Sequence, residues 1–546
     1  MRLPAVSLVV LLGLVTSCKN DTTETPSVSY PEKDRAAEAT KLLTGPDWYR
    51  HAVFYEVNVR SFQDSNGDGI GDLKGLTSRL DDLKTLGVDA LWLMPIMPTP
   101  FVDSGYDIAD YVGINPEYGT LADFDALLAA AHTRGMRVMI DLVLNHTSDQ
   151  HAWFKESRAD KTNPKADWYV WSDKKGRDDI GCGTANDTFG TDAWQFVPER
   201  NQYYFHRFYA GQPDLNYRNP EVVKATLDVA RFWLDKGVDG FRCDVIALLV
   251  ESATGCDFIP ETQDYIRKLR ALTDTYKDRA MVAESTNYSG SSDYYGNGKD
   301  MFHMAFNFAY GYLWALPFGG SSAANVAKPF EASKTKNPPG AQDALVIGSH
   351  DVNRAYVGAK GIDSRWQRAA FVQMTMPGTP YVYYGEELAL RPGEQKIVDG
   401  RDSARTPMLW SKGAGYGFTT GKPWIAFGPD ADVTNLEVEK ADPNSTYAFY
   451  RKLLGVRRGR EAFGTGTLQI FAADDPTVLA YSRTSSTETY VMAMGMDEED
   501  AHTTTVAGAN LPGDAQLVFG SGSLAREGTA AKITVPAAGM AIFRVR

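Results

Sequence analysis

The sequence has no long low-complexity tract, no internal repeat and no excess of positive charge. With 43% hydrophobic and 12% aromatic residues it can bury a large core, which argues against a globally disordered chain. The net charge of −13 argues against nucleic acid as the main partner, because phosphate binding requires a basic surface. A chain of 546 residues is too long for one compact module and indicates two or three domains.

The N-terminal apolar run, Ala5–Val15, is too short to span a bilayer and has the layout of a secretory signal peptide. It leads into Val15-Thr16-Ser17-Cys18, which resembles the bacterial lipobox, in which the cysteine is acylated after cleavage. We therefore expect residues 1–18 to be a lipoprotein signal peptide with Cys18 as the lipid site, and residues 19–45 to be a flexible tether. The alternative is an ordinary signal peptide with a chance cysteine.

Only four cysteines occur, and their contexts differ. The residue after Cys18 is Lys19 rather than the aspartate of an inner-membrane retention signal, so we expect an exported, lipid-anchored protein at the outer membrane or cell surface. Cys182 and Cys256 lie in glycine-flanked, loop-like stretches, and we expect them to pair because a disulfide persists in an exported chain. Cys243 lies inside a predicted strand and is typical of a small buried residue.

From Ala52 onward, short apolar strands alternate with amphipathic helices, the pattern of repeated βα units around a parallel sheet. The predicted strands are Val53–Val57, Ala90–Leu93, Arg137–Leu142, Gly240–Val245, Met281–Glu284, Met304–Phe308, Leu345–Ser349 and Tyr381–Tyr384. This number of strands fits a (β/α)₈ TIM barrel better than an open doubly wound sheet. Helical patterns fall between them at Leu73–Leu86, Leu121–Arg134 and Pro220–Lys236.

Two segments depart from this alternation. Residues 145–217 are too many for a plain connection and are rich in Trp, Tyr, Asp and Gly, which is typical of an inserted functional subdomain. After a predicted helix at Ser445–Arg457, Thr, Val, Ile and Ala alternate between glycine turns. We expect an α/β fold with a barrel over residues 46–460, a subdomain inserted after the third strand, and a C-terminal antiparallel β-sandwich over 461–546.

Acidic residues stand at the ends of several predicted strands. Asp244 ends the fourth strand, Glu284 ends the fifth, and Asp351 follows the seventh in Ser349-His350-Asp351. Side chains at the C-terminal ends of barrel strands share one rim. A lone acid there is usually a helix cap or an ion-pair partner. Several acids in one pocket raise the pKa of one member, which keeps a carboxylic acid protonated near neutral pH.

These strand ends, together with Asp141-Leu142-Val143-Leu144-Asn145-His146, resemble the core motifs of the α-amylase superfamily of glycoside hydrolases (family 13), over residues 46–546. The resemblance implies a retaining mechanism in which Asp244 attacks the anomeric carbon and Glu284 is the general acid and base. It implies that Asp351 stabilises the oxocarbenium-like transition state. Arg242 would keep Asp244 ionised.

The same resemblance implies contacts with the sugar. His146 and His350 would hydrogen-bond the hydroxyl groups of the sugar whose bond breaks, and Tyr106 would stack under that sugar. Asp107 and Arg405 would grip the terminal glucose and close one end of the pocket, which gives exo action. The alternative for this last pair is a structural salt bridge on the rim.

The string Gln212-Pro213-Asp214-Leu215-Asn216 resembles the signature of the oligo-1,6-glucosidase, α-glucosidase and trehalose synthase branch. Val245 resembles the α-1,6-preferring members, and Leu248 replaces a histidine that many endo-amylases carry. This implies hydrolysis of α-1,6 or α-1,4 bonds in α-glucan oligosaccharides. The alternatives are an endo-acting α-amylase, a trehalose synthase or transglycosylase, and a non-catalytic glycan-binding lipoprotein, which would have lost at least one catalytic acid.

The segment Asp64–Asp72 places oxygen donors at alternate positions with glycine at the bend, as in Ca²⁺-binding loops. An EF-hand would need glutamate at the twelfth position, where Gly75 stands. The segment instead resembles the divalent-metal loop of the same branch, which implies a structural Ca²⁺, or Mg²⁺ in its place, and no organic cofactor. The implied ligands are Asp64, Asn66, Asp68, the Ile70 carbonyl and Asp72. The alternative is a loop of Asx turns.

Overall fold

The computed structural model describes residues 42–180, 186–253, 255, 257–286, 290–308, 322–357, 359–395, 400–507, 511 and 514–545. Cys18, Cys182 and Cys256 lie outside the described residues, as does the chain before residue 42, so the lipid anchor and the disulfide stay predictions. No helix within the described ranges is long and apolar enough to cross a membrane.

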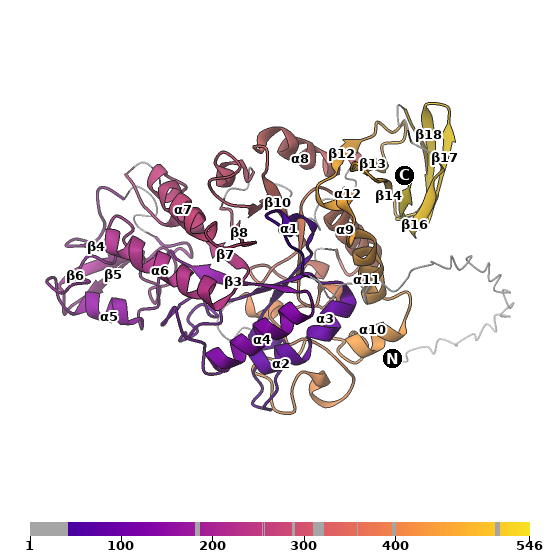
Figure 1. Ribbon diagram of the computed structural model, residues 1–546. Helices are drawn as coiled ribbons and strands as arrows, with labels where there is room; N and C mark the ends of the chain where they lie inside the picture. The colour runs from indigo at the N-terminus through magenta and orange to yellow at the C-terminus, as the bar shows by residue number, and fades with distance from the viewer. Residues whose placement is uncertain are drawn as a thin grey trace, which may run out of the picture. The chain divides into compact units, whose positions relative to one another are not determined.

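Eight parallel strands close into a barrel in the order β1-β11-β10-β9-β8-β7-β3-β2. Figure 1 labels β3, β7, β8 and β10 of this barrel. These are β1 (Phe54–Val57), β2 (Ala90–Leu93), β3 (Arg137–Val143), β7 (Gly240–Asp244), β8 (Ala280–Ala283), β9 (Met304–Phe306), β10 (Gln342–Val346) and β11 (Thr379–Tyr383). Every residue of these strands is buried, because helices cover the outside of the barrel and side chains fill its inside. The predicted (β/α)₈ barrel is confirmed.

One strand differs from its predicted position. The apolar run predicts a strand from Leu345, whereas β10 begins at Gln342, which pairs with Met304. Asp343 is also in this strand, and its carboxylate accepts hydrogen bonds from Ser291 and Tyr295, both 2.7 Å long. Hydrogen bonds from another part of the chain thus satisfy a polar residue that the apolar pattern leaves out of the strand.

The helices that accompany the barrel start and stop at recognisable residues. The helix α6 begins after Asn219, whose side chain accepts the Glu221 backbone N–H, and it ends at Gly237 in the left-handed conformation. The predicted Leu73–Leu86 helix is divided at Arg79. The helices are α1 (Trp48–His51), α2 (Leu73–Ser78), α3 (Leu80–Leu86), α4 (Leu121–Thr133), α5 (Ala152–Ala159), α6 (Pro220–Lys236), α7 (Pro260–Thr273), α8 (Ala323–Lys336), α9 (Asp363–Thr375), α10 (Leu436–Ala441), α11 (Thr446–Arg457) and α12 (Glu461–Gly464).

A small antiparallel sheet, β4-β6-β5, lies in the chain between β3 and β7. Its strands are β4 (Trp171–Ser172), β5 (Trp194–Val197) and β6 (Gln202–Phe205). Two isolated bridges, His146 with Asp214 and Tyr169 with Leu215, join the end of β3 and this insertion to the Gln212–Asn216 string. The insertion is thereby attached at the rim where the predicted catalytic acids stand.

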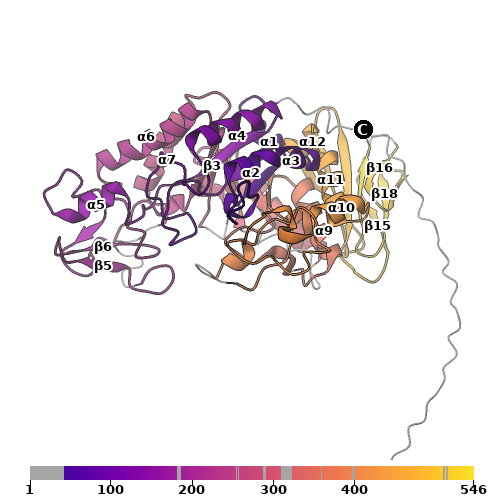
Figure 2. The ribbon, with the colours of Figure 1, turned by 90° about the horizontal axis from the view of Figure 1, so that it is seen from below.

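Two antiparallel sheets, β12-β13-β14-β19-β16 and β15-β18-β17, form the C-terminal part (Figure 2). Their strands are β12 (Thr467–Ile470), β13 (Val478–Thr484), β14 (Thr489–Gly495), β15 (His502–Val506), β16 (Gln516–Gly520), β17 (Ser523–Glu527), β18 (Ala530–Val535) and β19 (Met540–Arg544). Val491, Ile533 and Phe543 belong to one buried cluster contributed by both sheets. Arg368 of α9 donates to Glu498 at 2.7 Å, which ties this part to the barrel.

Candidate active site

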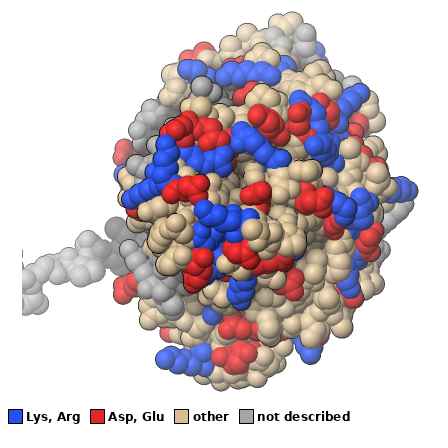
Figure 3. All heavy atoms as spheres, turned by 90° about the vertical axis from the view of Figure 1, so that its left-hand side faces the viewer, with Lys and Arg blue, Asp and Glu red and all other residues tan. Residues whose placement is uncertain are grey.

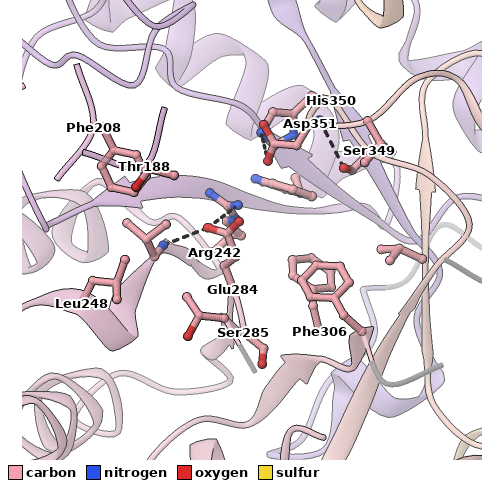
Figure 4. Close-up of a pocket in the computed structure, with 16 residues that line it drawn as sticks. Thr188, Phe208, Arg242, Leu248, Glu284, Ser285, Phe306, Ser349, His350 and Asp351 are labelled. Atoms are coloured by element: carbon pink, nitrogen blue, oxygen red, sulfur yellow. Dashed lines mark hydrogen bonds and ion pairs between the residues drawn. The ribbon is translucent and has the colours of Figure 1, made fainter. Parts of the chain in front are cut away.

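Three carboxylates converge on one buried guanidinium, that of Arg242 on β7. Figure 4 shows Arg242 beside one of them, Glu284. Nη1 of Arg242 lies 2.6 Å from Asp244 and 3.0 Å from Asp141, and Nη2 lies 2.9 Å from Glu284. Because Asp244 and Glu284 contact neighbouring nitrogens of one planar group, their carboxyl groups lie a few ångströms apart. Both line the same cavity of about 270 Å³. One sugar unit can therefore contact both acids.

The residue after Asp244 has a strained backbone. Val245 has a φ of 34° and a ψ of 36°, a left-handed conformation that β-branched residues rarely adopt. This turn directs its N–H to Oε2 of Glu284 at 2.9 Å. The contact from Arg242 also falls on Oε2. Oε1 is therefore the oxygen of Glu284 that can carry a proton toward a substrate.

The carboxyl groups around Arg242 do not titrate independently. Burial raises the pKa of Asp244 well above its ordinary value, Arg242 opposes that shift, and Glu284 and Asp141 reinforce it. Arg242 contacts Asp244 as expected, but the net shift of the Asp244 pKa is upward. Burial likewise raises the pKa of Asp141, and Arg242 opposes that shift, so the protonation of these carboxyl groups is coupled through one cation.

Asp351 lies in the loop after β10, beside several cationic groups. Its Oδ1 accepts from Arg401 at 2.8 Å, and its Oδ2 lies 3.2 Å from Nε2 of His350. Burial raises the pKa of Asp351, but His350, Arg401 and Arg405 outweigh burial and bring this pKa below its ordinary value. Asp351 is therefore ionised and can stabilise positive charge that develops on a sugar ring.

The predicted sugar-contacting residues also reach this cavity. His146, Tyr106 and His350 line it, and the ring of Tyr106 stacks on that of His350 with centroids 5.2 Å apart. Burial lowers the pKa of His146 to about 4, so its imidazole is neutral at pH 7. Nε2 of His146 lies 3.1 Å from the Gln212 amide nitrogen and 3.1 Å from the Tyr106 carbonyl oxygen.

The predicted clamp between Asp107 and Arg405 is wrong. Asp107 is fully buried, and its carboxylate accepts the backbone N–H groups of Val102 and Asp103 at 2.9 and 3.0 Å. Arg405 is also fully buried, and its Nε donates to the His350 carbonyl at 3.1 Å. Asp107 therefore holds a loop in place, and Nη2 of Arg405 lies 3.7 Å from Asp351.

The ion pair forms instead between Asp103 and Arg401, each four positions before the predicted residue. Arg401 contacts Asp103 as well as Asp351, and Arg401 and Asp103 both line the cavity. The sequence alone allows either pair, because aspartate stands at positions 103 and 107 and arginine at positions 401 and 405. The left-handed conformations of Ser104 (φ 50°) and Gly105 (φ 113°) reverse the chain and decide which aspartate faces the pocket.

A second cavity, of about 320 Å³, adjoins the first and shares Glu284, His350 and Asp351 with it. Figure 4 shows its labelled lining residues around Arg242 and Glu284. Apart from these shared groups the lining is largely apolar: Trp92, Val245, Leu248, Phe306, Phe308, Val346 and Val352. Sequence reasoning missed Thr188 and Phe208, which line both cavities and belong to the inserted segment. The high aromatic content of the inserted segment was the only feature of the sequence that pointed to such a role.

The Asp64–Asp72 loop is held by hydrogen bonds within the chain. The carboxylate of Asp64 accepts the backbone N–H groups of Asn66, Gly67 and Gly69 at 2.7–2.9 Å. Asp72 accepts from the N–H of Gly75 and caps α2. Within the described ranges, no three His, Cys, Asp or Glu residues are arranged to hold a metal ion. The loop geometry is that of Asx turns, and the Ca²⁺ site stays a prediction.

Acidic and basic side chains are interspersed on the face shown in Figure 3, which is the left-hand side of Figure 1. Exposed ion pairs also occur in the inserted segment. Lys174 with Asp178 and Lys161 with Asp173 are exposed pairs, 3.0 and 2.7 Å apart. Such pairs keep a surface hydrated and contribute little to stability.

Comparison with known proteins places this site in a family. The α-amylase catalytic domain matches residues 56–466. The chain is 38% identical over 504 residues to the trehalose synthase/amylase TreS of Mycolicibacterium smegmatis, covering 84% of each chain. It is 33% identical over 514 residues to an oligo-1,6-glucosidase of Parageobacillus thermoglucosidasius, covering 83% of this chain and 91% of the relative.

Solved structures agree with these relatives. A mutant of the enzyme MutB in complex with its substrate sucrose has a TM-score of 0.80 and 31% identity, over 92% of this chain and 100% of that chain. The α-glucosyl transfer enzyme XgtA has a TM-score of 0.79 and 32% identity over the same shares. The chain therefore belongs to the α-amylase family of glycoside hydrolases, family 13.

Proposed function

We propose that the protein is a retaining α-glucosidase that removes glucose from the non-reducing ends of α-1,6- or α-1,4-linked oligosaccharides. The observation that carries the proposal is the pairing of two features in one cavity. Asp244 and Glu284 share one guanidinium, and the Asp103–Arg401–Asp351 ion pairs lie against the same space. The first feature supports double displacement, and the second supports recognition of a chain end.

In the first step, Glu284 donates its proton to the glycosidic oxygen as the bond between that oxygen and the anomeric carbon breaks. An oxygen of Asp244 forms a bond to the anomeric carbon on its other face, and the aglycone leaves as an alcohol. In the second step, ionised Glu284 takes a proton from water, whose oxygen attacks the anomeric carbon and displaces Asp244. Asp351 stays ionised and stabilises both transition states.

The test of exo action is the product pattern with and without Arg401. The wild-type protein should release only glucose from isomaltose, maltose and panose, and should not cut a maltooligosaccharide whose non-reducing end is blocked. In Arg401→Met the terminal glucose loses a charged donor, so kcat/KM on maltose should fall about 10- to 100-fold, mainly through KM.

The matched control is Arg391→Met, which removes an arginine from the exposed pair with Asp430. This variant should match the wild type on every substrate. Internal cleavage of the blocked substrate by the wild-type protein would contradict exo action and favour an endo-acting amylase.

A second candidate is transfer of the glucosyl group to another sugar. The observations that favour it are the 38% identity to a protein named trehalose synthase/amylase and the apolar second cavity beside Glu284. A sugar hydroxyl would then replace water in the second step, with the same proton transfer to Glu284. Trehalose or longer glucosides formed from maltose would support this candidate, and free glucose alone would support hydrolysis.

Two further proposals concern features outside the reaction. A structural Ca²⁺ in the Asp64–Asp72 loop is supported by the alternating oxygen donors. Chelation should then lower the melting temperature by several degrees and leave the chemical step unchanged, whereas unchanged melting would leave a loop of Asx turns.

Export with a lipid on Cys18 is supported by the lipobox-like string. Fatty-acid labelling that persists in Cys18→Ser would contradict the lipid proposal.

A further inference from the structure

A buried carboxylate contacts the ring of His350 from the side opposite the cavity. Glu56 is on β1 and is 1% exposed, and its Oε1 lies 2.5 Å from Nδ1 of His350. The steps of double displacement give Glu56 no role. A charged residue in the centre of a barrel strand is costly to bury unless it is paired, so this contact requires an explanation.

The other nitrogen of the ring, Nε2, faces oxygen atoms as well. It lies 2.7 Å from the hydroxyl of Tyr106 and 3.2 Å from Oδ2 of Asp351. The Tyr106 hydroxyl also lies 3.0 Å from Asp141, which accepts from Arg242 and from the Trp92 indole N–H at 3.2 Å. Because the Tyr106 hydroxyl donates its own proton to Asp141, its oxygen can only accept from Nε2. Nε2 then has to donate.

Both ring nitrogens of His350 therefore face acceptors, which is the arrangement of a doubly protonated imidazole. The groups around Glu56 fit this arrangement. Glu386 accepts the Gly348 backbone N–H at 3.1 Å, and burial and the charge of Glu56 raise its pKa well above its ordinary value. The carboxylate that faces Nδ1 of His350 is that of Glu56, at 2.5 Å. Arg405 donates to the His350 backbone carbonyl, and its Nη2 lies 3.7 Å from Oδ1 of Asp351.

We propose that Glu56 is a positioning residue for glucoside cleavage: it holds His350 doubly protonated, with the Nε2 proton directed to Tyr106 and Asp351 at the floor of the cavity. The proposal deepens the function given above and rests on it, because His350 acts on the sugar that Asp244 attacks. The positive ring would support the ionised state of Asp351 and donate to a sugar hydroxyl.

The test observes the His350 ring directly by ¹⁵N nuclear magnetic resonance of histidine-labelled protein, which has eight histidines. The His350 signal is identified by its loss in His350→Asn. Above neutral pH, where a free imidazole has lost its second proton, the wild-type protein should show both His350 nitrogens protonated. Glu56→Gln should show one unprotonated nitrogen, and its kcat/KM should fall roughly 10- to 100-fold.

The matched control is Glu387→Gln, which alters a buried carboxylate that accepts from Tyr55 at 2.7 Å. It should keep the wild-type His350 signal. A neutral His350 ring in the wild-type protein, or a doubly protonated ring in Glu56→Gln, would overturn the proposal. The wild-type spectrum decides even if Glu56→Gln does not fold. Because the signal needs no substrate, an inactive protein with a doubly protonated His350 would refute the glucosidase function alone.

Discussion

Asp244→Ala is expected to reduce kcat by roughly four to six orders of magnitude, the range seen when a nucleophile acting in concert with other groups is removed. The loss is this large because Glu284, which also contacts Arg242 and lines the cavity, is needed as the proton donor and cannot replace the nucleophile. Asp141 is fully buried, and its carboxylate already accepts hydrogen bonds from Arg242, Trp92 and Tyr106. Steady-state and single-turnover rates on isomaltose and maltose measure the effect.

Stability provides the control for this variant. Burial and two neighbouring carboxylates raise the pKa of Asp244, so its presence is unfavourable for folding, and Arg242 keeps two ionic partners without it. The melting temperature of Asp244→Ala should equal or exceed that of the wild type. Asp125→Asn, which removes one partner of an exposed pair with Lys236, should retain full activity. Near-normal turnover in Asp244→Ala would rule out the assignment of the nucleophile.

Glu284→Gln is expected to lower kcat/KM on maltose and isomaltose by about 10²- to 10⁴-fold, the contribution of a general acid. Glutamine preserves the shape and can still accept the Val245 N–H, but it cannot protonate a leaving oxygen. Substrates with leaving groups that need no proton, such as α-glucosyl fluoride, should form the glucosyl-enzyme at a nearly normal rate. Stopped-flow measurement of fluoride release resolves this first step.

The dependence on the leaving group separates acid catalysis from a general loss of structure. Azide needs no base to attack, so it should restore turnover of α-glucosyl fluoride in Glu284→Gln. Glu221→Gln, at the exposed start of α6, is the matched control and should behave as the wild type. An equal loss on sugar and fluoride substrates, without rescue by azide, would show that Glu284 is not the acid.

The barrel, and the position of three acids at its rim, could be predicted because local sequence determines both. Parallel strands buried on both faces appear as apolar runs, and an acid at the end of such a run is placed on the rim by the topology alone. Asp244, Glu284 and Asp351 therefore needed no tertiary information. The polar start of β10 was missed because the hydroxyl groups that bond Asp343 belong to Ser291 and Tyr295, in a different part of the chain.

Other parts of the site depend on backbone conformation and on contacts distant in sequence. The choice of Asp103 over Asp107 follows from two left-handed residues between them, which residue types alone do not specify. Val245 is left-handed although valine disfavours that conformation. Glu56 reads as one polar residue in a strand until His350, far along the chain, is placed against it. The direction of the Asp244 pKa shift also needs the positions of Glu284 and Asp141.

In the proposed mechanism Asp244 becomes covalently bonded to glucose, while Glu284 donates and then accepts a proton. Mass spectrometry of Glu284→Gln after brief reaction with α-glucosyl fluoride tests this mechanism, since the intermediate should form in that variant but break down slowly. We expect a protein heavier by one glucosyl unit, with the added mass on the peptide that contains Asp244. An unmodified protein that has nevertheless released fluoride, or a glucosyl unit on any other residue, would contradict it.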